Sequence, residues 1–100
     1  MTDEYEVVMT QKATSDFAQI YLYLAYVLMR PDLANKVEER LLSKINSLSY
    51  TPRRFREFGS GECRVAAVKY YKIIYCINEI DKKVYILKII YSLSDTETLS

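Results

Sequence analysis

The spacing of apolar residues changes between residues 48 and 64, and this change constrains the fold more than any other feature of the sequence. In residues 13–48 apolar side chains recur at three- and four-residue steps, as in amphipathic helices. In residues 64–91 they alternate or run continuously, as in β-strands. Residues 50–62 separate the two patterns and contain both glycines of the chain. Helices followed by a run of strands predict an α+β domain.

The helical region predicts a hairpin of two helices that meet at Pro31. Proline is tolerated in the first turn of a helix, so we expect it to end one helix and begin the next. Two helices joined by so short a connection pack as an antiparallel pair. The core-facing stripes are Phe17, Ile20, Leu24 and Leu28 in the first helix and Val37, Leu41, Ile45 and Leu48 in the second. Three tyrosines, Tyr21, Tyr23 and Tyr26, point in different directions, so at least one is expected to be exposed or to meet a partner.

Four strands are predicted, at residues 5–9 before the helices and at residues 64–69, 71–77 and 84–91 after them. The order β-α-α-β-β-β predicts an antiparallel sheet packed on the helical hairpin. Alternation should place Ile73, Tyr75 and Ile77 on one face, with Ile74 and Cys76 on the other. In the last strand both faces are apolar, with Tyr85, Leu87 and Ile89 opposite Val84, Ile86 and Ile90. A partner chain is therefore expected over the second face.

Length and composition limit the chemistry that this chain can perform. Its 100 residues suit one domain spanning residues 1–100, and a net charge of +1 means that any polyanion needs a local basic patch. The chain has no histidine, which argues against a Ser-His-Asp triad and a zinc site, and we expect no metal and no cofactor. Cys63 and Cys76 are too few for a disulfide framework and are expected to be structural thiols.

The N-terminus, Met1-Thr2-Asp3-Glu4, carries acidic residues where a secretory signal would carry basic ones. No apolar run approaches the roughly 18 to 20 residues needed to cross a bilayer. We therefore expect a cytoplasmic protein without a membrane partner.

One basic cluster stands out, in and after the irregular segment. Its members are Arg53, Arg54, Arg56, Arg64, Lys69 and Lys72. Such side chains would hold phosphate, and the rings of Phe55, Phe58, Tyr70 and Tyr71 between them could stack on unpaired bases. The alternative is a solvated loop whose arginines pair with Glu57 and Glu62.

The order and spacing of these elements resemble the RelE/ParE superfamily of bacterial type II toxins, over nearly the whole chain. The landmarks are Tyr5-Glu6-Val7, Ala13, Asp16-Phe17, Ile20, Pro31, Ala34, Ile45, Leu48, Pro52, Arg64, Lys69 to Tyr75, Val84 to Tyr91 and Asp95. The resemblance implies a growth-inhibiting toxin of a toxin–antitoxin module, of the kind associated with plasmid stabilisation. It would be neutralised by a cognate antitoxin, in a hetero-oligomer or beside a second toxin copy.

Members similar to RelE cut mRNA on the ribosome, and members similar to ParE inhibit DNA gyrase. Metal-free RNA cleavage needs a base, cations and an acid. By resemblance Arg64 would bind the scissile phosphate. The chemical requirements would be completed by Glu57 or Glu62 as base and by Lys69 or Tyr91 as the source of charge or a proton. The last strand ends in Tyr91-Ser92-Leu93-Ser94-Asp95, without the arginines usual in active relatives.

Three hypotheses remain open. The first is a toxin that acts by binding a target such as DNA gyrase, and the absent histidine and the strand end without arginines favour it. The second is a ribosome-dependent mRNA endonuclease that uses Arg64 and its basic neighbours. The third is a member that has lost toxicity and only binds antitoxin.

Overall fold

The computed structural model describes residues 4–59 and 61–92. Asp95 and most of the acidic N-terminus lie outside the described residues. The elements are β1 (Glu6–Met9), α1 (Gln11–Leu22), a π-helical turn (Tyr23–Val27), α2 (Pro31–Ser47), a 3-10 turn (Pro52–Arg54), β2 (Arg56–Glu57), β3 (Cys63–Val68), β4 (Tyr71–Asn78) and β5 (Lys83–Tyr91). Within the described residues, no helix is long and apolar enough to cross a membrane.

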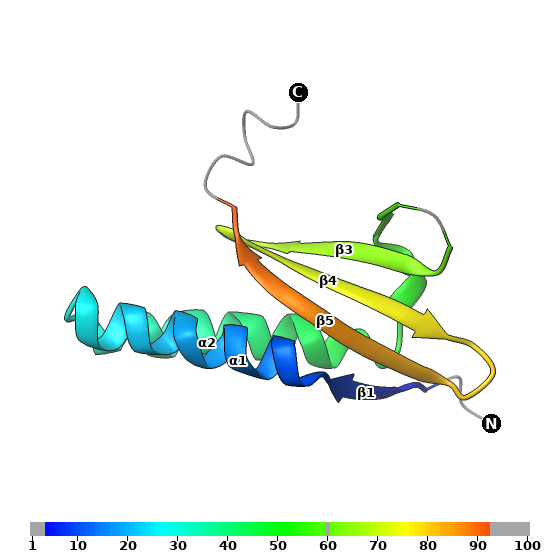
Figure 1. Cartoon of the computed structure of the whole chain (residues 1–100), viewed down its shortest axis with the longest axis horizontal. Helices are drawn as coiled ribbons and strands as arrows, with labels where there is room; N and C mark the ends of the chain where they lie inside the picture. Colours follow the sequence, from blue (N-terminus) through cyan, green and yellow to red (C-terminus); the bar gives the residue numbers. More distant parts are fainter. Residues whose placement is uncertain (1–3, 60, 93–100) are drawn as a thin grey trace.

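The helical hairpin begins and turns where the sequence predicts. Thr10 caps α1, because its hydroxyl oxygen accepts a hydrogen bond from the amide of Ala13 at 3.2 Å. Pro31 occupies the first turn of α2. The π-helical turn is closed by the amide of Leu28, which donates to the carbonyl oxygen of Tyr23 at 2.9 Å. The two helices lie side by side, and their connected end extends well beyond the sheet (Figure 1).

The five strands form one sheet in the order β1-β5-β4-β3-β2. The predicted α+β class and the sheet on a helical hairpin are confirmed. The sheet is mixed, because β1 runs parallel to β5 while the other neighbouring strands are antiparallel (Figure 1). The reason lies in the connection: the whole helical hairpin and three strands separate β1 from β5, so no tight turn requires them to run in opposite directions.

The core lies between the helical hairpin and one face of the sheet. Ile73, Tyr75 and Ile77 belong to it as predicted, whereas Ile74 is buried outside that cluster. In β5 the alternation predicted from sequence fails, because Ile86 and Ile89 both lie in the core. An irregularity in the pairing of β4 with β5 leaves Leu87 without a partner, and one extra residue reverses the faces beyond it.

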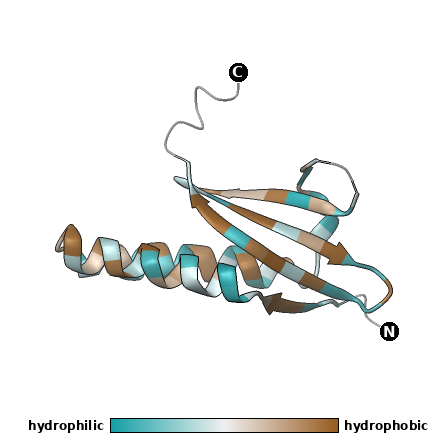
Figure 2. Cartoon of the chain, in the orientation of Figure 1, coloured by the Kyte–Doolittle hydropathy of each residue, from teal (hydrophilic) through white to brown (hydrophobic). Residues whose placement is uncertain are grey.

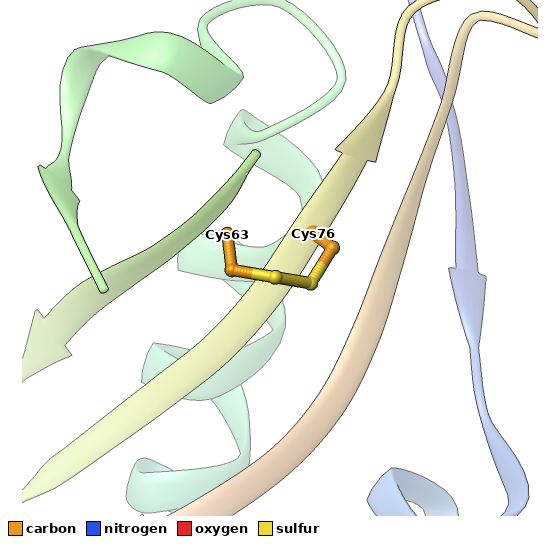
Figure 3. The surroundings of a disulfide bond; sticks show 2 residues. All are labelled: Cys63 and Cys76. Atoms are coloured by element: carbon orange, nitrogen blue, oxygen red, sulfur yellow. A yellow bond between two sulfur atoms is a disulfide. The ribbon is translucent and has the colours of Figure 1, made fainter. Parts of the chain in front are cut away.

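A disulfide bond joins Cys63 to Cys76, so the expectation of two structural thiols is wrong (Figure 3). The two cysteines face each other across β3 and β4. The amide of Ile77 donates to the carbonyl oxygen of Glu62 at 3.0 Å, which makes the cysteines the adjacent, closely spaced pair of the ladder. Counting cysteines could not reveal this, because the bond depends on strand register.

Candidate functional site

The loop between α2 and β3 is held against the sheet by two neighbouring side chains. The hydroxyl of Tyr75 donates to the carbonyl oxygen of Pro52, and burial raises the pKa of Tyr75 to about 12. Arg64, the partner of Tyr75 across β3 and β4, donates from Nη1 to the carbonyl oxygen of Phe55 at 3.2 Å. The side chains of Tyr75 and Arg64 therefore hold the loop between α2 and β3, which carries the basic residues, on the sheet.

Arg64 points toward the helical side of the sheet and is largely covered. Its side chain is only 14% exposed, and within the described residues its Nε atom is buried without a hydrogen-bond partner. Glu57 lies 3.8 Å from Nη1, at ion-pair distance. The structure thus brings together the predicted phosphate-binding arginine and one of the two predicted bases.

Arg53 lies on the surface and is paired with acidic side chains of the protein itself. It forms ion pairs of 2.7 Å with Glu62 and 3.1 Å with Glu79. Lys82, Tyr5 and Arg53 together lower the pKa of the Glu79 carboxyl group to about 2. For Arg53 the geometry favours the alternative in which a loop arginine pairs with glutamates at the surface and does not bind phosphate.

The other predicted cations are spread over different surfaces. Arg54 and Lys69 line a polar groove beside α2, and Arg56 is exposed in the edge strand β2. Lys72 lies in β4 opposite Ile90 of β5. The predicted cluster is therefore divided into smaller groups.

Tyr91, the predicted proton donor, lies at the far end of the sheet from Arg64. Its ring packs edge to face on that of Tyr71, with centroids 5.4 Å apart. Lys69 follows the end of β3, five residues from Arg64, which corresponds to roughly 16 Å along an extended strand. Among the proposed nuclease residues, Arg64 and Glu57 are thus brought together, whereas Lys69 and Tyr91 line different grooves.

The four rings proposed to stack on bases differ in accessibility. Phe58 and Tyr70 are 45% and 52% exposed, whereas Tyr71 is buried. Lys44 and Arg54 both lie over the ring of Phe55, at 4.9 Å and 5.2 Å from its centroid. Two of the four rings are thus exposed, and one of them, Tyr70, has the ammonium group of Lys69 at 5.4 Å from its centroid.

An apolar groove of about 460 Å³ that the sequence did not predict lies between α1 and the ends of β4 and β5. Its walls include Ile20, Tyr23, Leu28, Tyr71, Ile89 and Tyr91. The sequence feature that could have indicated this groove is the run of apolar residues around Tyr23, which extends beyond the core-facing stripe of the first helix. Strand pairing was needed to place Tyr91 opposite that run.

The ribbon at the end of the helical hairpin adjoining this groove is coloured largely hydrophobic (Figure 2), and apolar side chains are exposed there. They are Leu22, Tyr23, Tyr26, Val27, Leu28 and Met29, and we call them the apolar tip. Tyr26 and Met29 are 70% and 74% exposed. The prediction that a tyrosine of the first helix is exposed is confirmed, and such a contiguous surface is typical of a protein interface.

Comparisons with known proteins agree on the class of protein. The model of the family described as ParE toxin of type II toxin–antitoxin system, parDE, matches residues 7–95. No curated protein sequence matches the chain at a significant level.

Among solved structures, the chromosomal ParDE toxin–antitoxin system of P. aeruginosa has a TM-score of 0.77 at 19% identity and covers 90% of this chain and 98% of that one. The isolated RelE toxin of E. coli has a TM-score of 0.68 at 15% identity, covering 95% of each chain. The RelBE2 complex of Mycobacterium tuberculosis has a TM-score of 0.64 at 20% identity, covering 91% and 93%. The chain therefore belongs to the ParE family of toxins of type II toxin–antitoxin systems.

Proposed function

We propose that this toxin acts by binding DNA gyrase and performs no RNA cleavage. The family match establishes that the chain is a toxin of a type II toxin–antitoxin system. It also supports DNA gyrase as the target, because members similar to ParE inhibit gyrase. The fold alone does not choose the target, since related folds carry different functions. The choice depends on how the side chains are used.

The observation that carries this proposal is the position of Arg64. An arginine that binds a scissile phosphate must present its donors to solvent, but Arg64 uses Nη1 to hold the Phe55 carbonyl and is 14% exposed. Releasing it would remove one of the two side-chain hydrogen bonds, from Arg64 and Tyr75, that hold this loop on the sheet. Arg64 is therefore a positioning residue for the loop in this proposal.

The distances between the other proposed nuclease residues also argue against RNA cleavage. General acid–base cleavage requires the base, the cation and the acid to converge within hydrogen-bond reach of one phosphate. Tyr91 is paired with Tyr71, four residues along β4 from Tyr75, the partner of Arg64, and Lys69 lines a different groove from Tyr91. This spacing argues against one phosphate held by all four side chains.

Two assays with purified components test the target. We expect the toxin to inhibit supercoiling of relaxed plasmid by gyrase and to leave mRNA intact on programmed ribosomes. In induced cells, labelled thymidine incorporation should then fall before labelled amino-acid incorporation. Cleavage of mRNA without an effect on gyrase would establish the endonuclease alternative, and neither effect would establish a member without toxicity.

Arg64→Lys separates the structural role from a chemical one. It keeps the positive charge but loses the planar donor group, so we expect a lower free energy of unfolding, with gyrase inhibition retained below the melting transition. Lys36→Ala, an exposed change in α2, is the control. Loss of activity in a fully folded Arg64→Lys protein would contradict the positioning role.

The structural neighbours include toxin–antitoxin complexes, which supports a cognate antitoxin as partner. We infer that an apolar segment of the antitoxin occupies the apolar groove and contacts the apolar tip. The two surfaces are continuous through Tyr23 and Leu28, which belong to both. Together they offer the aromatic and aliphatic anchors typical of binding hot spots.

Substitution of Leu28 by Asn should weaken antitoxin binding by about tenfold or more without lowering the melting temperature. Leu28 is 45% exposed, so its loss leaves the core intact. Ile80→Asn is a matched control, because Ile80 is an exposed apolar residue distant from the groove in the β4–β5 turn. Equal effects of both substitutions in a titration with purified antitoxin would contradict this docking site.

A further inference from the structure

A second groove, of about 570 Å³, lies beside α2 and is basic in character. The second half of α2 provides Arg40 and Lys44, the loop provides Arg54, and the end of β3 leads to Lys69. Sequence reasoning had assigned Arg54 and Lys69 to a phosphate-binding cluster but placed them with other partners. Folding instead brings them together with Arg40 and Lys44, two cations of α2 that were not part of the predicted cluster.

These four cations have no acidic side chain at ion-pair distance within the described residues, a property that they share with Lys36, Arg56 and Lys88. By contrast, Arg53, Arg64 and Lys83 each contact a glutamate. The positive charge of the groove is thus left uncompensated by the folded chain.

The charge is also concentrated here relative to the rest of the protein. The groove holds four cations and one carboxylate, that of Glu39, whereas the whole chain has a net charge of only +1. Outside the groove, acidic side chains outnumber basic ones. A polyanion approaching this protein would therefore be directed to this groove.

The chemistry of the lining favours a phosphodiester backbone over an acidic peptide. Arg40, Lys44, Arg54, Lys69 and the hydroxyl of Ser43 offer chiefly hydrogen-bond donors, whereas the hydroxyl of Ser47 donates to the carbonyl oxygen of Lys44 at 2.7 Å. A phosphodiester backbone presents acceptors only, whereas a peptide also needs acceptors for its amides.

The contacts of Phe55 favour binding of the phosphate backbone over stacking of bases. Lys44 and Arg54 lie over this ring, so the aromatic side chain in the groove positions two cations and is not open for base stacking. Contacts of this type hold a nucleic acid without reading its sequence.

We propose that this groove binds the phosphate backbone of a nucleic acid, independently of base sequence. The proposal goes beyond inhibition of gyrase, because it assigns the toxin a nucleic-acid contact of its own. Gyrase works on DNA, so duplex DNA is the form that we expect the groove to hold.

The experiment is fluorescence anisotropy of a labelled 20-base-pair DNA duplex of mixed sequence, titrated with the full-length toxin at several salt concentrations. Four phosphate contacts predict that log K falls with log salt concentration with a slope of roughly −3 to −4. A duplex of different sequence should bind equally well. The assay contains no gyrase, so its outcome does not depend on whether gyrase is the target.

Lys44→Gln and Arg54→Gln should each weaken binding and reduce the slope by about 0.9, and the double substitution should reduce it by about 1.8. Lys36→Gln is the matched control, because Lys36 is an exposed lysine of the same helix outside the groove. Melting curves confirm that each variant is folded.

Three results would overturn the proposal. The first is no binding of either duplex DNA or a single-stranded RNA of similar length at low salt. The second is equal loss of binding in Lys36→Gln and Lys44→Gln. The third is binding of polyglutamate through Lys44 and Arg54 while neither nucleic acid binds, which would show that the groove takes an acidic protein segment.

Discussion

The hydroxyl group of Tyr75 donates a hydrogen bond of 2.5 Å to the carbonyl oxygen of Pro52, across 23 residues of sequence and inside the protein. Tyr75 is fully buried in β4, and Pro52 begins the loop that carries the basic residues. This bond ties the loop to the middle of the sheet.

Tyr75→Phe should lower the free energy of unfolding by about 1–3 kcal/mol, because the buried carbonyl of Pro52 would lose its donor. Urea denaturation followed by circular dichroism measures the change. Tyr50→Phe is the control, since Tyr50 is 67% exposed. Equal midpoints for wild type and Tyr75→Phe would show that water replaces the hydroxyl at no cost.

Asp16 joins the first helix to the last strand. One carboxylate oxygen accepts from the amide of Ile89 at 3.1 Å and the other pairs with Lys12, while the side chain is 11% exposed. Asp16→Ala should therefore cost about 1–3 kcal/mol of stability, and Asp16→Asn less, because an amide oxygen can still accept. Lys12→Ala, which removes only the exposed partner, should cost under about 1 kcal/mol. An Asn variant as unstable as the Ala variant would contradict the acceptor role.

Reduction of the Cys63–Cys76 disulfide should destabilise the protein. The cysteines are 13 residues apart, and closing a loop of this size contributes about 3 kcal/mol. Unfolding with and without dithiothreitol measures the difference, and the double substitution by serine should behave like the reduced wild type. Two thiols titrating in native protein kept free of reductant would contradict the bond.

Glu79 should make stability depend on acidic pH. Its pKa of about 2 in the folded protein lies below the ordinary value of 4.5, chiefly because of Lys82, Tyr5 and Arg53. The contribution is therefore complete above about pH 4.5 and is lost as the pH falls toward 2. Urea midpoints measured across this range should fall with pH in wild type and fall less in Glu79→Gln. Parallel curves would contradict the low pKa.

The arrangement of elements could be predicted because each depends on local signals. Pro31 and Thr10 mark the helix ends, and the change of apolar spacing separates helices from strands. The direction of β1 and the extra residue at Leu87 could not be predicted, because both depend on pairing between distant segments. Sequence spacing contains no information on such register.

In the candidate site, too, local features could be predicted from the sequence and long-range contacts could not. The basic loop was visible in the sequence, but Arg64 lies beneath it and Arg53 pairs with Glu79, contacts that only the folded chain creates. Arg40 and Lys44 were missed because they lie on a helix whose polar face is ordinary in composition. Proximity across elements decided which cations share a surface.

The parallel pairing of β1 with β5 joins residues 6–9 to residues 83–86. During synthesis, the first strand therefore waits for a partner until the last strand of the domain has been made. A partly synthesised chain lacks β5, and with it Val84, Ile86 and Ile89 of the core. Contacts this distant in sequence form slowly, so the nascent toxin remains incomplete throughout its translation. The topology itself thus means that the domain can complete its sheet and its core only after its last strand has been synthesised.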